Sequence, residues 1–382
     1  MTTANKRNVA IELLRVLACF LVIMAHIQLK PVISDGTFSW KRICFSSLIG
    51  DNVPIFFLIT GFYMFQTVNA EEYIFQQYKR KVKNFLRTLW FPSLLVVIIT
   101  CIINSWLHGN PLGQDISWGW LHNYVFRISA NGTCGHLWYI CTYVRFIVFF
   151  PIMAFICQDK PAHNRVRRIY LLLSLFHILL SDAEYLVQKE IFDFSKIVFD
   201  YYFLYLLIGN EIGILFRGKE MSKRKILYRG GVALYVWGNL MRITLQNYAF
   251  EHWGTDIKSW FMGLECLPTY MSSCGIFLLF CSLKNIRWKL PHVWAFLGKY
   301  SFYIYLFHFM VIRKLQSLQV QSYILDMHDG GTGFVHIGFY YIEFGGIVFA
   351  ISLLLGIIFQ KFYALLLKTM RKILPPVRLQ YG

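Results

Sequence analysis

Long uninterrupted apolar runs are the sequence feature that most constrains the fold of this chain. Several runs continue for about twenty residues, the length that a helix needs to cross the hydrocarbon core of a bilayer. A membrane β-barrel is built instead from alternating segments of about ten residues. Hydrophobic residues make up 57% of the chain and charged residues only 15%, which is too apolar for a water-soluble globule. The sequence therefore predicts an all-α integral membrane protein.

Windowed hydropathy predicts a bundle of about ten transmembrane helices, of which the fifth is the weakest. They lie near residues 10–29, 48–66, 86–105, 136–157, 168–182, 199–216, 229–246, 264–283, 293–312 and 336–360. We expect one membrane domain over residues 1–382, without a separate soluble domain. No signal-peptide cleavage pattern follows the first run, so we expect this run to remain as a helix.

The distribution of cations orients these helices. Lysine and arginine gather in alternate loops, while most of the acids lie in the loops between them, which is the positive-inside pattern. The basic clusters are Lys79–Lys83, Arg165–Arg168, Lys223–Lys225 and Lys284–Lys289. We therefore expect both termini in the cytoplasm. This bias accounts for most of the formal net charge of +18, so the sequence does not indicate nucleic-acid binding.

The nine cysteines show no metal-binding pattern, because none of them forms a CxxC pair, and no metal site is predicted. Most of them lie in or beside apolar runs. Cys44 and Cys134 fall in predicted outer loops. A disulfide between these two stays open, although we expect two free thiols.

The first apolar run carries ionisable residues along one face. Arg15 and His26 are eleven positions apart, which returns to nearly the same helix face about 16 Å along the axis. Such residues are costly in a membrane and by default mark a functional site. Alternatively, Arg15 reaches the headgroups and His26 is a structural hydrogen-bonding residue between helices. His308 lies at a similar depth in the ninth span, which favours a cavity shared by both histidines.

Two segments near the second span carry further candidate groups. Asp51 and Pro54 open this span, and Thr60-Gly61 allows a helix or a ligand to approach closely. The segment Lys79–Arg87 places five cations on the cytoplasmic side. They suit a phosphorylated ligand, or else they anchor the helix to anionic membrane lipids.

The longest predicted outer loop, residues 106–135, is rich in aromatic residues. Its tryptophans include Trp118 and Trp120. They either anchor the adjoining helices at the membrane interface or form a platform that stacks on a sugar face.

With these motifs in place, the chain resembles the acyltransferase 3 family, integral membrane enzymes that O-acylate bacterial surface polysaccharides. Within that family it is similar to the branch that acetylates O-antigen or enterobacterial common antigen. The motifs that carry the resemblance stand in the expected order: Arg15 with His26, Pro54-Ile55-Phe56-Phe57 before Thr60-Gly61-Phe62, His136-Leu137-Trp138-Tyr139, and Tyr300-Ser301 with Tyr305-Leu306 and His308.

Two positions depart from the family pattern. Thr60 stands where the family usually has serine, which retains the hydroxyl group. The family also commonly carries two arginines three residues apart, but here Asn84 precedes Arg87. A second cation would then have to come from Arg80, Lys81 or Lys83.

The resemblance implies that acetyl-CoA binds from the cytoplasm and that a hydroxyl of a surface polysaccharide or lipid-linked glycan is acylated near the outer face of the bacterial inner membrane. His26 is the expected general base or transient acyl carrier. The expected ligands of CoA are Arg15, Arg80, Lys83 and Arg87. The candidates that orient His26 or the acceptor, or stabilise an oxyanion, are His308, Asp51, His136 and Thr60. The expected acceptor-binding residues are His136, Trp138, Trp118 and Trp120.

Two other classes of protein are compatible with ten helices that carry internal charges. One is a transporter or flippase for a glycan, and the other is a non-catalytic subunit of a polysaccharide export complex. The paired helix-breaking segments typical of transporters are not visible in corresponding halves of the sequence. The acyltransferase interpretation is therefore preferred.

Overall fold

The structure is a computed structural model that describes residues 8–33, 36–65, 74–107, 116–158, 160–190, 201–216, 221–283 and 289–373. Within these ranges the chain forms a bundle of helices, and an isolated β-bridge joins Val32 to Phe38. The prediction of an all-α fold is confirmed.

The elements follow one another along the chain as α-helices with a few short 3₁₀ or π turns. Their bounds are α1 (Val9–Ile27), α2 (Trp40–Ile49), α3 (Asn52–Met64), α4 (Ile74–Phe85), η2 (Leu86–Trp90), α5 (Phe91–Leu107), α6 (Ile116–Phe126), η3 (Gly132–Leu137), α7 (Trp138–Ile156), α8 (Pro161–Val187), α9 (Tyr201–Phe216), α10 (Met221–Trp253), η5 (Trp260–Met262), α11 (Leu267–Ser282), α12 (Pro291–Ser317), α13 (Val320–Met327), η7 (Asp329–Gly331) and α14 (Phe334–Ile373).

Eight helical segments of the described chain are long and apolar enough to cross a membrane, so the protein is a multi-pass membrane protein. The second of them, Trp40–Met64, combines α2 and α3, and the third, Ile74–Trp106, runs from α4 into α5. The length and apolarity of the described helices thus give eight candidate spans, compared with the ten predicted from the sequence. The span expected at 199–216 is α9, an apolar helix of 16 residues. The span expected at 229–246 lies within α10, which is not among the eight.

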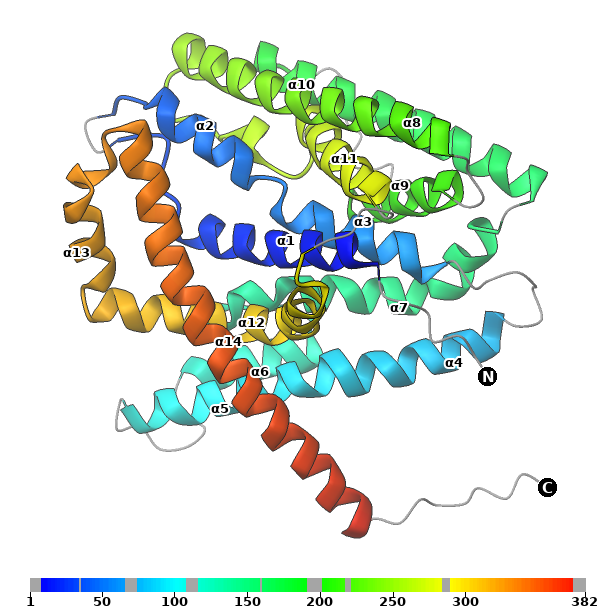
Figure 1. The fold of residues 1–382 in the computed structure, drawn as a ribbon, viewed down its shortest axis with the longest axis vertical. Coiled ribbons are helices and arrows are strands. Elements are labelled where there is room, and N and C mark those ends of the chain that lie inside the picture. The colour runs from blue at the N-terminus through cyan, green and yellow to red at the C-terminus, as the bar shows by residue number, and fades with distance from the viewer. Residues whose placement is uncertain are drawn as a thin grey trace.

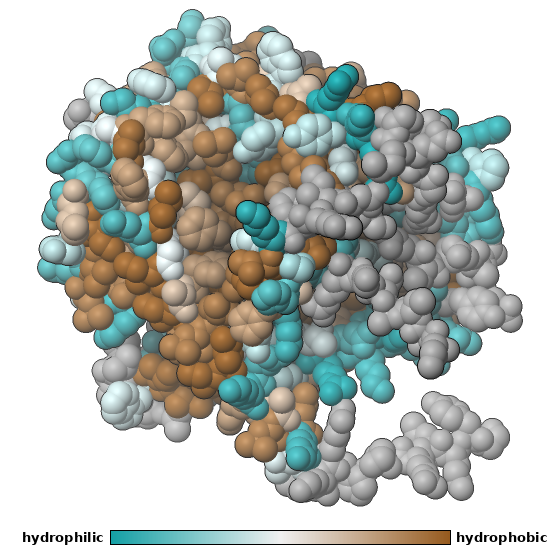
Figure 2. Space-filling model, in the orientation of Figure 1, coloured by the Kyte–Doolittle hydropathy of each residue, from teal (hydrophilic) through white to brown (hydrophobic). Residues whose placement is uncertain are grey.

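The exposed surface of the bundle is apolar where a bilayer would meet it. Large hydrophobic side chains stand exposed on several helices, among them Phe149 and Ile152 of α7, Leu172 of α8 and Ile358 of α14. Figure 2 shows hydrophobic side chains across much of the middle of one face and hydrophilic ones toward its left and right edges. Such a surface suits contact with the hydrocarbon core of a bilayer.

Helix α1 lies at the centre of the bundle, where it contacts α3, α11, α12 and α14 (Figure 1). Around it, α10 packs along α11, α3 along α9, and α12 along α14. In Figure 1, α1 begins right of centre and runs to the left, while α14 runs from the upper left to the bottom of the view. The central position of α1 brings its polar face against other helices rather than against lipid.

Helices α3 and α9 cross closely because glycines face each other's backbone. A Cβ atom at Gly61 would collide with the carbonyl of Leu206, and one at Gly209 would collide with the carbonyl of Leu58. Small residues at such a crossing allow two membrane helices to gain van der Waals contact along their backbones. The close approach predicted at Thr60-Gly61 is therefore made by a helix.

Candidate active site

A cavity of about 690 Å³ lies between α1, α3, η2, η3, α7 and α12. Its volume is within the range of small-molecule binding sites. Five residues predicted from the sequence line it: Arg15, His26, Thr60, His136 and Trp138. Residues that are far apart in the sequence thus share one space.

Helical periodicity explains how each element contributes a stripe to this cavity. Residues three or four positions apart lie on the same helix face. The stripes are Arg15, Val22 and His26 on α1, Asn52, Phe56 and Thr60 on α3, His136, Tyr139 and Tyr143 on η3 and α7, and Gly298, Ser301 and Tyr305 on α12.

One end of the cavity is cationic. The guanidinium Nη1 of Arg15 lies 3.2 Å from Oε2 of Glu12, one turn earlier on α1. The side chain of Lys299 also lines the cavity. Glu12 is buried against Gly298 of α12, where a Cβ atom would strike its carboxylate. The glycine thus admits the acid that orients Arg15 toward the cavity.

Three histidines form a cluster at the other end. The ring centre of His308 lies 5.1 Å from that of His26 and 5.2 Å from that of His136. His26 is exposed at the cavity, whereas His136 and His308 are buried. The ring of Phe309 lies 5.2 Å from the rings of both His26 and His136. The sequence made His136 and His308 candidates to orient His26 or the acceptor, and the structure brings the three rings together.

The hydrogen bonds of His308 define its tautomer. Its Nδ1 lies 2.7 Å from the carbonyl oxygen of Tyr305, and because a carbonyl only accepts, Nδ1 carries the proton. In the neutral ring, Nε2 is then an acceptor. This atom is buried and has no hydrogen-bond partner in the described part of the chain. Nε2 of His308 can therefore accept a hydrogen bond from a nearby ring N–H or from a substrate hydroxyl.

His136 is held in place by the backbone and side chains of α12. Its Nε2 lies 3.2 Å from the carbonyl oxygen of Leu306. The hydroxyl of Tyr305 donates a hydrogen bond to the carbonyl of His136. The 3₁₀ helix η3, which precedes α7, is therefore fastened to α12 at the histidine cluster.

Asp51 lies apart from this cluster, although the sequence made it a candidate to orient His26. Its Oδ1 accepts hydrogen bonds from Nη2 of Arg242 at 2.9 Å, from Ser272 at 2.6 Å and from Ser273 at 2.8 Å. Arg242 is completely buried and also donates to the carbonyl of Ser47. The carboxylate is thus engaged in a network that joins the α2–α3 bend to α10 and α11.

The hydroxyl of Thr60 lines the cavity but is already engaged. It donates to the carbonyl of Phe56 at 2.8 Å, one turn earlier on α3, and lies 3.5 Å from the hydroxyl of Tyr139. To stabilise an oxyanion, Thr60 would first have to rotate away from Phe56.

Trp118 and Trp120 do not line the cavity. The indole Nε1 of Trp118 donates to Oγ of Ser105 at 3.1 Å, which ties α6 to α5. The ring of Trp120 packs against Gly132, whose positive φ of 56° favours glycine. These contacts fit a packing role, while Trp138 is the one of the predicted tryptophans that reaches the cavity.

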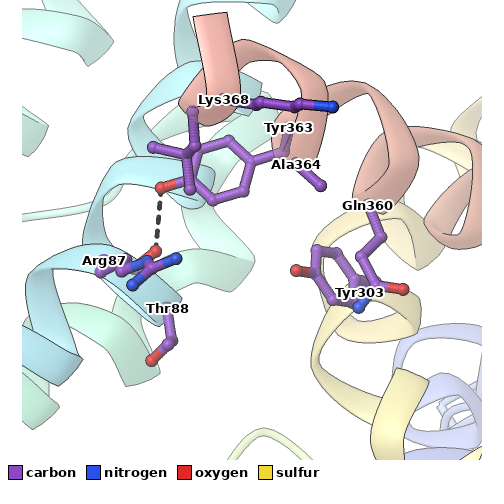
Figure 3. A pocket seen from close by; sticks show the side chains of 8 residues that line it. Arg87, Thr88, Tyr303, Gln360, Tyr363, Ala364 and Lys368 are labelled. Carbon is purple, nitrogen blue, oxygen red and sulfur yellow. Dashed lines mark hydrogen bonds between the residues drawn. The ribbon is translucent and has the colours of Figure 1, made fainter. Parts of the chain in front are cut away.

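The predicted phosphate ligands are separated by the structure. Arg80 and Lys83 are exposed on α4 and line neither this cavity nor its neighbour. Arg87 lines a second cavity of about 480 Å³ between η2, α12 and α14. Figure 3 shows Arg87 and Thr88 on one side of this second cavity, facing Tyr303 and Gln360, with Lys368 above them. No acidic residue is among its described lining residues.

One residue, Thr88, lines both cavities. Arg87 and Thr88 lie in η2, a π-helical turn whose altered repeat changes the direction of successive side chains. The hydroxyl of Tyr363 on α14 donates to the carbonyl of Arg87 at 2.8 Å, as the dashed line in Figure 3 marks. The last helix therefore forms part of the surroundings of Arg87, which hydropathy did not indicate.

Several cavity residues were not singled out as site residues from the sequence. They are Asn52, Tyr139, Lys299, Ser301 and Tyr305. All five stand in or beside motifs that carry the family resemblance, and the spacing of three or four along each helix could have placed most of them on the same face as the predicted residues.

The chemistry available at this site is that of histidines, hydroxyls and cations. No group of three histidine, cysteine or acidic side chains in the described ranges has the geometry to hold a metal ion. Cys44 and Cys134 are both free thiols. A base that faces the cavity, next to a buried acceptor and remote from a cationic end, suits transfer of a group between an anionic donor and a hydroxyl.

Comparison with known proteins identifies one family. Residues 8–361 match the family described as the acyltransferase domain, that is, the acyltransferase 3 family. No curated protein and no solved structure matches the chain.

Proposed function

The chain belongs to the acyltransferase 3 family, and from this membership we propose that it is an O-acetyltransferase of the bacterial inner membrane. It transfers an acetyl group from cytoplasmic acetyl-CoA to a sugar hydroxyl of a lipid-linked or cell-surface polysaccharide. The observation that carries the proposal is the continuous cavity from Arg15 to His26. Along α1 these residues lie about 16 Å apart, so an extended thioester arm that enters at Arg15 reaches the histidine cluster.

In the proposed reaction, His26 removes the proton of the acceptor hydroxyl as its oxygen attacks the thioester carbonyl carbon. The carbon–sulfur bond then breaks, and the imidazolium returns the proton to the leaving CoA thiolate. In this proposal, Nε2 of His308, which has no hydrogen-bond partner in the described part of the chain, accepts a hydrogen bond from His26 and so stabilises the protonated ring of His26. His136 and Trp138 contact the acceptor.

The proposed donor site combines both cavities. Arg15 and Lys299 attract the anionic donor at the cationic end of the first cavity. The second cavity, with Arg87 and Lys368 on its walls, accommodates the phosphorylated nucleotide. Guanidinium groups bind phosphate through paired, charge-assisted hydrogen bonds. The thioester arm then passes Thr88, the residue that both cavities share.

This donor site predicts different effects for cations that the sequence alone grouped together. Arg87→Ala is expected to raise the KM for acetyl-CoA by about 10- to 100-fold, because it removes charge-assisted hydrogen bonds to phosphate. Arg80→Ala and Lys83→Ala, as matched controls on the neighbouring helix, are expected to change KM by less than about twofold. Initial rates over a range of acetyl-CoA concentrations measure this.

A thioester donor that lacks the nucleotide distinguishes the loss of phosphate binding from general damage to the protein. The KM for S-acetylpantetheine should be the same for Arg87→Ala and the wild type. Equal effects of Arg80, Lys83 and Arg87 substitutions would contradict the assignment of the second cavity.

The proposed function is tested by the acyl content of surface glycans. Cells in which the chain is deleted should lose O-acetyl groups that mild base releases, and the wild-type chain should restore them. NMR of the glycan then identifies the acetylated hydroxyl. Purified protein in lipid nanodiscs should transfer radiolabel from [14C]acetyl-CoA to glycan from the deletion cells. Unchanged glycan acylation in the deletion cells and no transfer in nanodiscs would reject the proposal and favour a transporter.

A further inference from the structure

An arginine at the outer end of α12 stands next to the histidine cluster. The guanidinium carbon of Arg313 lies 5.2 Å from the ring centre of Phe309. The same ring centre lies 5.2 Å from that of His26. Two steps of 5.2 Å each thus connect them, so the guanidinium lies no more than 10.4 Å from the centre of the proposed catalytic ring.

The hydrogen-bond donors of Arg313 are available to a ligand. Its side chain is exposed, and no acid in the described part of the chain forms a salt bridge with it. Three acids are engaged elsewhere: Glu343 with His328, Asp329 with His336, and Asp51 with Arg242. A guanidinium stacked on an aromatic face keeps the N–H groups at its edge free to bind a planar anion.

The location of Arg313 is also unusual for an arginine that only anchors a helix. With the orientation that the loop charges predict, this end of α12 faces outward, where the positive-inside pattern disfavours lysine and arginine. Lys314 follows it and is exposed as well. A residue that only anchored α12 to headgroups would not need to share an aromatic ring with two histidines of the cavity. Phe309 places Arg313, His26 and His136 around one ring.

We propose that Arg313 binds an anionic group of the acceptor, so that the substrate is a glycan with a phosphate or a carboxylate close to the acylated hydroxyl. This inference rests on the proposed acyl transfer and narrows its acceptor. Phe309 is the positioning residue that sets the distance between the bound anion and His26. Charge on the acceptor thereby selects which hydroxyl reaches the base.

The test uses glycan lipids extracted from cells that lack this chain and separated on an anion exchanger into retained and unretained fractions. Each fraction is offered with [14C]acetyl-CoA to the full-length protein in phosphatidylcholine nanodiscs. The wild type should label the retained, anionic fraction. Arg313→Gln should raise the KM for this acceptor by about 10- to 100-fold and leave the KM for acetyl-CoA unchanged. Arg313→Lys should recover part of the loss, because it retains the charge.

Matched controls distinguish the acceptor from membrane lipid. Lys314→Gln removes the adjacent exposed cation and should leave both KM values unchanged. Nanodiscs that contain phosphatidylglycerol should give the same result. If the effect of Arg313→Gln appears only with this lipid, Arg313 binds headgroups and the inference is overturned. If the wild type labels the unretained fraction and the kinetics of Arg313→Gln are unchanged, the inference is overturned. The proposed acyl transfer is then still supported. If the wild type labels neither fraction, both proposals fall.

Discussion

His26→Ala is expected to abolish most acyl transfer, with kcat lowered by about 10²- to 10⁴-fold, the usual contribution of a general base. The reason is geometric. His26 is the one member of the histidine cluster that is exposed at the cavity, while His136 and His308 are buried and fastened to backbone carbonyls of α12. The measurement is the initial rate of transfer from [14C]acetyl-CoA at saturating substrate, with the purified protein in nanodiscs.

A histidine outside the cavity provides the matched control for this substitution. His122 on α6 is exposed and contacts the ring of Phe126, so His122→Ala should retain the wild-type rate. Binding of acetyl-CoA to His26→Ala should persist, because Arg15 and Arg87 remain. If wild type and His26→Ala restore base-labile acyl groups equally at matched membrane abundance, His26 is not part of the mechanism. The protein would still be an acyltransferase.

Arg242→Met is expected to lower the free energy of unfolding by about 3–5 kcal/mol, the usual cost of breaking a buried ion pair. It leaves the carboxylate of Asp51 buried without its cation, and Asp51 is only 1% exposed. The network of Asp51, Arg242, Ser272 and Ser273 joins the α2–α3 bend to α10 and α11, which hydropathy alone does not connect. Thermal unfolding in detergent, followed by fluorescence-detected size exclusion, should show a large fall in Tm.

Two companion variants separate the lost ion pair from the change of side chain. Arg229→Met alters an exposed arginine of the same helix and should leave Tm close to that of the wild type. Asp51→Asn combined with Arg242→Met removes both charges and should recover much of the lost stability, because no unpaired charge stays buried. If the double variant is no more stable than Arg242→Met alone, the carboxylate is not the source of the cost.

The spacing of residues within single helices predicted much of the candidate site. Arg15 and His26 share a face of α1 because eleven positions return to nearly the same direction, and both line one cavity. His26 and His308 were expected at one depth, and their rings lie 5.1 Å apart. These properties are set by the helical repeat and by distance from the ends of each apolar run, so they can be derived before any helix meets another.

Contacts between helices decided what spacing could not. Trp118 was a candidate for a platform that stacks on a sugar, but its indole donates a hydrogen bond to Ser105 on the preceding helix. Asp51 resembled a partner for His26, but its partner is Arg242, 191 positions away in the sequence. Arg80, Lys83 and Arg87 formed one basic segment, but of the three only Arg87, which lies in the π turn η2, lines either of the two cavities described above.

The sequence by itself determined the all-helical membrane fold, the family and the polar face of α1, because the bilayer imposes length and apolarity on each span and the helix imposes its period. The tertiary structure alone decided that Arg242 of α10 pairs with Asp51, how close the three histidine rings lie, and that Arg313 lies beside Phe309. These depend on which helices pack together, and a buried polar group finds its partner across helices, where hydropathy and periodicity carry no information.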